Sequence, residues 1–239
     1  MISRRHILIL LPAVLLSLSA YCQTRDSERL GMALEYFTSA KYHEALLIFE
    51  RLDKQYKLND RFHAYMGVCY FHEWEYAKAC QYLEAAMPSL EVFAPHERSV
   101  YYYTNAESHF QQEHYAEAIP YYERTLGVCY DNEKPHLHYR LGFCYMFLKN
   151  WEYAATHFRQ SLSYYERFNQ LEEARARIPQ VKNMLKGCEH ELRQIAQANM
   201  TEMGDSIIRD EIHRDTLQSD SVYTIDLRQL YEQKIEVGE

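Results

Sequence analysis

Residues 33–52 read ALEYFTSAKYHEALLIFERL, and this stretch decides which fold the chain can adopt. Apolar and aromatic residues in each half follow the i, i+3, i+4, i+7 spacing of an amphipathic α-helix. A short polar joint near Ala40 and Lys41 separates the two halves, so the stretch predicts a helical hairpin. Each of the two helices is too short to be stable alone, and the hairpin must therefore stack on copies of itself.

The same phrase returns three more times along the chain. Each copy has a small residue in its first helix and an alanine twelve positions later in its second helix. The four pairs are Ala33/Ala45, Gly67/Ala79, Ala106/Ala118 and Gly142/Ala154. The aromatic residues three positions before the second alanine are Tyr42, Tyr76, Tyr115 and Trp151. The numbers of the four small residues give spacings of 34, 39 and 36 residues, which indicates a repeat architecture.

This pattern resembles the tetratricopeptide repeat family, in which small and aromatic residues recur at these spacings over a period of about 34 residues. The resemblance covers about residues 27–165. It implies an all-α fold, a right-handed superhelical solenoid of about four helical hairpins, in which the small residues let helices approach closely. For function it implies only a generic role in protein binding, because function resides in a site and not in a fold.

The sequence departs from the family pattern at several places. The residues that replace the family's tryptophan-like residue early in the first helix are Arg29, His63, Tyr102 and His138. Pro120 falls inside the second helix of the third repeat, where we expect a local kink or a late helix start. Extra residues lie in segments 87–98 and 127–138, and we expect them to lengthen the loops between repeats.

Residues 179–198 predict one further helix after the repeats. Pro179 suits the first helical position, apolar residues recur along one face, and the other face is charged. A helix with a polar outer side can cap a solenoid, so we expect the solenoid and its cap to span residues 23–200. Residues 201–239 are polar and acidic and predict a mostly flexible tail with a short amphipathic segment at 222–235.

Residues 1–22 have the composition of a secretory signal peptide. Arg4 and Arg5 precede an apolar run from Ile7 to Leu18, and small residues follow it. The run is shorter than the ~20 residues that a helix needs to cross a bilayer. We expect cleavage after Cys22 and export to the periplasm or outer membrane of a Gram-negative bacterium. The alternative interpretation is a lipoprotein, anchored to the membrane through a lipid on Cys22.

The charge of the chain excludes one class of partner. The formal net charge is −8, and loss of two arginines with the signal peptide makes it −10 (−8 minus 2). Binding of a phosphate backbone relies on clustered Lys and Arg, so nucleic acid is not an expected partner. The 22 tyrosines against 7 glycines instead indicate wide half-buried surfaces, on which the ring is covered and the hydroxyl stays wet.

Cysteine and histidine patterns do not indicate a catalytic or metal site. The cysteines that remain after the expected cleavage are Cys69, Cys80, Cys129, Cys144 and Cys188. Cys69 and Cys144 share one repeat position, which favours buried thiols between helices, although the sequence does not decide which cysteines form disulfides. The pairs His136/His138 and His109/His114 have spacings unsuited to sharing a metal ion. We therefore expect surface or groove histidines, no metal, no cofactor and no enzymatic activity.

The resemblance places the binding surface on the first helix of each hairpin, which lines a concave groove in this family. Carried over by repeat position, the groove residues are Leu34, Phe37, Tyr65, Val68, Phe71, His72, Tyr103, Glu107, Phe110, Gln111, Tyr139, Arg140, Phe143, Met146 and Phe147. Their aromatic character predicts binding of an apolar or aromatic peptide or helix of another envelope protein. Segment 222–235 of the chain itself is a second candidate occupant. The alternative function is glycan or cell-wall binding by the tyrosines, with Glu107 as the only acid in the groove.

The tail carries three tripeptides of the form Asp-Ser/Thr-aliphatic. Their hydroxyl residues are Ser206, Thr216 and Ser221. These tripeptides resemble the sites of a general O-glycosylation system of some Gram-negative envelopes, and ordinary helix-capping residues are the alternative.

Overall fold

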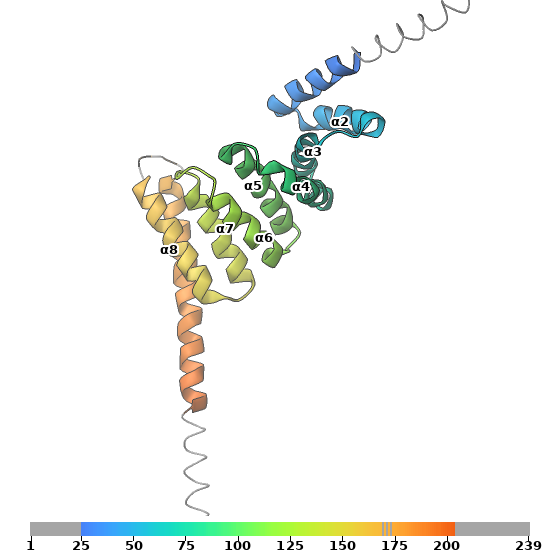
Figure 1. The fold of residues 1–239 in the computed structure, drawn as a ribbon. Coiled ribbons are helices and arrows are strands. Elements are labelled where there is room, and N and C mark those ends of the chain that lie inside the picture. Colours follow the sequence, from blue (N-terminus) through green and yellow to red (C-terminus); the bar gives the residue numbers. More distant parts are fainter. Residues whose placement is uncertain (1–24, 169, 171, 173, 204–239) are drawn as a thin grey trace, which may run out of the picture. The chain divides into compact units, whose positions relative to one another are not determined.

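The computed structural model describes residues 25–168, 170, 172 and 174–203 (Figure 1). Regular structure in these residues is helical, and the elements are 25–38, α2 (Tyr42–Tyr56), α3 (Asp60–His72), α4 (Tyr76–Leu90), α5 (Pro95–Gln111), α6 (Tyr115–Leu126), α7 (Lys134–Phe147), α8 (Trp151–Arg167) and 174–203. The chain divides between Leu185 and Lys186 into two compact units, and α2 to α8 all belong to the first.

The helices pair as the repeat predicts. The most extensive contacts join α3 to α4, α5 to α6 and α7 to α8, and each hairpin also contacts the next one along the chain. Every second helix begins at the aromatic residue of its repeat. These first residues are Tyr42, Tyr76, Tyr115 and Trp151. The predicted all-α fold of stacked helical hairpins is therefore confirmed.

The four joints inside the hairpins share one backbone geometry. The residues with positive φ, between 56° and 65°, are Ala40, Trp74, Glu113 and Lys149. In each joint the next residue donates its N–H to the carbonyl five positions earlier, as Glu75 does to Tyr70 at 2.9 Å. This is the Schellman motif, which satisfies free carbonyls at a helix end and turns the chain back. A side chain with a Cβ occupies the left-handed position at every joint, where glycine is the usual residue.

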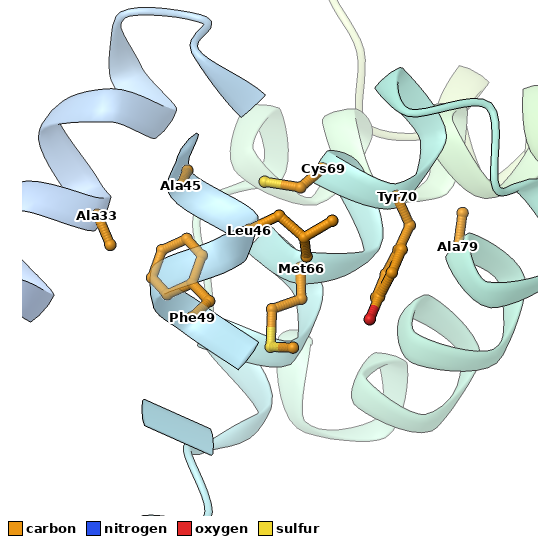
Figure 2. Close-up of a cluster of buried hydrophobic side chains, with 8 residues drawn as sticks. All are labelled: Ala33, Ala45, Leu46, Phe49, Met66, Cys69, Tyr70 and Ala79. Atoms are coloured by element: carbon orange, nitrogen blue, oxygen red, sulfur yellow. The ribbon is translucent and has the colours of Figure 1, made fainter. Parts of the chain in front are cut away.

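Small residues make the close helix contacts in the core. Figure 2 shows Ala33 of the first helix and Ala45 and Phe49 of α2 in one buried cluster. In the next hairpin, a Cβ added to Gly67 would lie 2.6 Å from Cγ of Leu83, closer than packed atoms tolerate. The helices of a hairpin therefore approach so closely that only a small side chain fits between them.

Two prolines lie inside helices. Pro120 is the sixth residue of α6, which begins at Tyr115 like the other second helices, so the predicted late start is wrong. The predicted loop at 87–98 is also too long, because α4 continues through Pro88 to Leu90. Buried Leu90 prolongs the apolar face of α4, and both prolines are exposed, so each lost N–H bond falls on the outer side of its helix.

The last helical segment is longer than the sequence predicts. Helical residues run from 174 to 203, so Pro179 lies inside the helix and not at its start. Within the first unit, Val181 is fully buried and Nζ of Lys182 lies 3.2 Å from a carboxylate oxygen of Glu166 in α8. The expected signal peptide (1–22), the segment 222–235 and the candidate glycosylation sites Ser206, Thr216 and Ser221 lie outside the described residues.

None of the described helices combines the length and the apolar character that a membrane span requires.

Candidate functional site

A connected set of rings lies on α5, α6 and α7, and we call it the aromatic ladder. Its members are Phe110, Tyr115, Tyr139, Phe143 and Phe147. The rings of Tyr115 and Phe147 stack with centroids 4.6 Å apart, and Tyr139 meets Phe143 edge to face at 4.7 Å. Phe147 keeps 48% of its surface exposed, and the other four are half-buried. The ladder therefore presents ring edges and faces to solvent from a rigid base.

The ladder joins the third hairpin to the fourth. Phe110 lies one residue before the end of α5. It contacts Tyr115 at the start of α6 at 5.3 Å and Phe147 at the end of α7 at 6.2 Å. Phe143 also packs edge to face on buried Phe158 of α8 at 5.5 Å. Each ring contacts a ring on at least one other helix, so neighbouring side chains support the exposed surface.

A buried ion pair between Glu107 and Arg140 lies beside the ladder. Glu107 is 3% exposed, and its carboxylate accepts hydrogen bonds from the Tyr122 hydroxyl at 2.6 Å and from Nη2 of Arg140 at 2.7 Å. The guanidinium carbon of Arg140 lies 4.8 Å from the centroid of Phe110, a cation–π contact. Burial and the neighbouring Glu107 charge raise the pKa of Tyr122, which keeps its hydroxyl protonated as the donor. A buried carboxylate needs such partners, so this network ties α5, α6 and α7 together.

A second group of rings lies on the first two hairpins. Phe37 lies 4.6 Å from Tyr65, and Tyr42 stacks on His72 at 3.8 Å. Phe71 lies edge to face against His72 at 5.3 Å. Like the ladder, this group combines first-helix residues with the aromatic residue that starts a second helix. The predicted groove contained residues of the first helices only, so it did not include Tyr42 and Tyr115, which lie beside those residues.

The structure places the fifteen predicted groove residues in three environments. Val68 and Glu107 are buried, so these two serve the interior and leave little surface for a partner. The exposed residues are His72, Gln111 and Phe147. The half-buried residues are Leu34, Phe37, Tyr65, Phe71, Tyr103, Phe110, Tyr139, Arg140, Phe143 and Met146.

Two histidines do not lie where the sequence predicts. His109 and His138 are buried between helices, so the prediction of surface or groove histidines is wrong for both. Nε2 of His109 lies 2.8 Å from a carboxylate oxygen of Glu84 on α4, and Nδ1 of His138 lies 3.1 Å from Nδ1 of His157 on α8. A polar partner on the neighbouring helix allows each ring to replace an aromatic residue of the repeat.

Two cysteines at the same repeat position are buried between helices. Burial raises the pKa of Cys69 and of Cys144 to about 12, so both thiols remain protonated and unreactive at neutral pH. Their shared burial confirms the predicted packing role of this repeat position. Within residues 25–168 and 174–203, no group of three or more His, Cys, Asp or Glu side chains could hold a metal ion.

Comparison with known proteins gives matches to solved structures only. No family model and no curated protein matches the chain. A structure of MamA AMB-1 matches 73% of this chain and 97% of its own, at 14% identity and a TM-score of 0.53. A structure of MamA MSR-1 matches 67% of this chain and 96% of its own, at 14% identity and a TM-score of 0.50. The APC/C hetero-tetramer Cut9-Hcn1 matches 68% of this chain over 29% of its own, at 13% identity and a TM-score of 0.51. At these identities the likeness concerns the fold.

Proposed function

Because the chain has the fold of tetratricopeptide-repeat proteins, we propose that it is a non-enzymatic scaffold of the bacterial envelope that binds another protein. The partner contributes an apolar or aromatic segment, as a peptide or a helix, to the face made by the first helices of the hairpins. Export rests on the signal peptide expected at residues 1–22, and recovery of the protein in the periplasmic fraction after osmotic shock tests it.

The aromatic ladder is the observation that carries this proposal. It connects five rings on α5, α6 and α7, and Phe147 is 48% exposed although it contacts other rings of the ladder. Exposed apolar surface of this kind is costly for an isolated soluble protein and marks a binding surface. Rigid aromatic residues contribute much contact area at a low entropic cost, which makes them effective anchors of an interface.

The chemistry of the ladder favours a protein partner over a glycan. Recognition of a sugar would pair an aromatic face with carboxylates that bind hydroxyl groups. Glu107, the only acid among the predicted groove residues, is buried and already bonded to Tyr122 and Arg140. An apolar segment needs no such polar partner and is the better match for this surface.

A photo-crosslinking amino acid at Gln111, an exposed residue next to Phe110, tests the proposal in intact cells. We expect a discrete crosslinked partner that disappears when Phe147→Asp is added. The control is Val92→Asp, which places the same charge at a valine that is 85% exposed and outside the ladder. An identical set of crosslinks with and without Phe147→Asp would contradict the proposal. A crosslink within the chain that is lost on removal of residues 204–239 would identify the tail as the occupant instead.

A further inference from the structure

A pocket of about 250 Å³ opens between α5, the segment after α6 and the start of α7. Ser99, Val100 and Tyr103 of α5 line the pocket, and so do His136 and Leu137 of α7. Cys129 closes one side and belongs to residues 127–133, which connect α6 to α7. The extra residues that lengthen this repeat therefore build part of the pocket, and the repeat pattern alone does not predict it.

Three polar side chains that line the pocket already have a hydrogen-bond partner within the protein. The hydroxyl of Ser99 donates to the carbonyl of His96 at 2.7 Å, and the hydroxyl of Thr125 donates to the carbonyl of Tyr121 at 2.8 Å. The carboxylate of Glu133 accepts the N–H of Tyr130 at 2.8 Å.

The two rings that line the pocket, those of Tyr103 and His136, are likewise partners of each other. The hydroxyl of Tyr103 and Nε2 of His136 lie 3.0 Å apart, within hydrogen-bond distance. Burial, with Arg140 and Arg177 nearby, lowers the pKa of His136 to about 4, so its ring is neutral at physiological pH. A guest therefore meets mainly side-chain methyl groups and ring surfaces, and no cation. The Glu133 carboxylate keeps acceptor capacity for a neutral N–H or O–H donor, but a guest's own acceptors would find no cationic partner.

The volume of the pocket and the geometry of its rings further restrict which guests it can bind. An apolar cavity of about 150 Å³ already admits a benzene ring, and sites for drug-sized ligands begin at about 300 Å³. The pocket therefore has room for one ring system and not for a larger cofactor. The rings of Tyr103 and His136, with centroids 6.0 Å apart and planes inclined at 51°, can contact an inserted ring on its face and edge.

We propose that this pocket binds one neutral aromatic side chain of the partner peptide and anchors the peptide on the first-helix face. The inference rests on the proposed function for the identity of the guest, but the pocket can be tested without the partner. Val100 is 43% exposed and lines the pocket, so a guest can enter from solvent. A single aromatic anchor in a desolvated pocket is the form that interface hot spots commonly take.

Indole is a suitable probe, with methyl NMR of the purified protein as the readout. We expect saturable shifts of the Val100 and Leu137 methyl groups with a dissociation constant in the millimolar range, as for other fragments of this size. Indole-3-acetate should bind at least about tenfold more weakly, because the Glu133 carboxylate repels it and no lining residue offers a cation. The absence of saturable shifts at these methyl groups would overturn the proposal.

Two substitutions at the exposed Val100 separate the pocket from the rest of the face. Val100→Trp fills the pocket from its open side, and Val100→Asp places a charge there, so each should weaken indole binding at least about tenfold. Val92→Trp adds the same ring at an exposed valine outside the pocket and should leave indole binding unchanged. Circular dichroism confirms that the variants are folded. If Val100→Trp and Val100→Asp both retain affinity within about twofold, the pocket is not the site.

The two proposals fail in distinguishable ways. If indole binds as expected but no partner crosslinks at Gln111, the pocket stands and the scaffold function falls. If a partner crosslinks equally well to the wild type, Val100→Trp and Val100→Asp, the scaffold function stands and the anchoring role of the pocket falls.

Discussion

Gly142 shows how little space the repeat leaves at its small position. A Cβ built on Gly142 would lie 2.6 Å from Cε1 of Phe158, which is fully buried. Phe143 and Tyr139 pack on the same ring, so it cannot move away. Gly142→Ala should therefore lower the free energy of unfolding by about 1–2 kcal/mol, because overpacking outweighs the gain in helix propensity. Urea denaturation of the two proteins measures the difference.

Gly31→Ala is the matched control for this substitution. Gly31 is also helical, but among the described residues no side chain, and no backbone outside its own helix, lies within 4 Å of its added Cβ. The same chemical change should therefore stabilise the protein by about 0.5–1 kcal/mol. Equal effects of the two substitutions would show that close helix contact does not decide which residue is allowed at Gly142.

Asn105 occupies a repeat position where its equivalents are apolar. It is fully buried on α5, at the position that Met66 and Leu141 hold in the neighbouring repeats. Neither Nδ2 nor Oδ1 has a hydrogen-bond partner among the described residues. Asn105→Leu should therefore raise the free energy of unfolding by about 1–3 kcal/mol, since it removes an uncompensated buried amide and adds apolar contact. A higher thermal midpoint would support this reading, and a lower one would show that the amide is hydrogen-bonded in solution.

The hairpin joints make a separate contribution to stability. A residue with a Cβ costs about 1–2 kcal/mol in the left-handed region, and glycine costs about 0.5–1 kcal/mol more than alanine in unfolded-chain entropy. Lys149 is exposed, has φ of 59°, and occupies the left-handed position of the last joint. Lys149→Gly should therefore raise the free energy of unfolding by about 0.5–1 kcal/mol, and Lys149→Val should lower it by at least as much. Chemical denaturation of both variants tests the assignment, because a purely electrostatic role of Lys149 predicts equal effects.

The helix boundaries that the sequence predicts correctly are those set by residues close by in the chain. The first residues of α2, α4, α6 and α8 coincide with the repeat's aromatic residue. In the first three copies this residue packs on a phenylalanine across the joint. The passage of α4 through Pro88 could not be predicted from propensity, because burial of Leu90 in the tertiary fold compensates the lost hydrogen bond. The Schellman joints were also missed, since no glycine marks them.

The repeat pattern predicts only part of the candidate site. Position in the repeat places the ladder residues of α5 and α7 in the predicted groove set, because residues at equivalent repeat positions lie on the same face of their helices. It could not show that Glu107 turns inward, which depends on Tyr122 and Arg140 from two other helices. The pocket depends on Cys129 in a connection whose path the repeat does not define. The repeat pattern therefore does not predict contacts that join side chains from three different elements.

Acid should destabilise the protein unevenly along the chain. Burial, together with His157 and Lys134, lowers the pKa of His138 to about 4, and that of His136 is also about 4. Above about pH 6.5 both histidines are neutral in the folded and unfolded states, so stability is constant with respect to them. Between about pH 6.5 and 4 the unfolded chain binds more protons, and each histidine should cost about 1.4 kcal/mol per pH unit. Burial also lowers the pKa of His72 and of His157, which add to the slope. Urea denaturation at pH 7, 6 and 5 measures this slope, and His138→Phe should reduce it without abolishing it.

The two histidines lie on α7, and this location predicts where the protein opens first. In a stack of hairpins each hairpin is stabilised mainly by its own contacts and by those with its immediate neighbours. A loss of stability in one hairpin is therefore not shared equally along the chain. Amides of α7 and α8 should therefore lose hydrogen-exchange protection at pH 5 relative to pH 7, after correction for intrinsic rates, more than those of α2 and α3. In His138→Phe this difference between the two ends should shrink. Equal loss of protection in all hairpins would show that the chain unfolds as one cooperative unit and that acid sensitivity does not originate at α7.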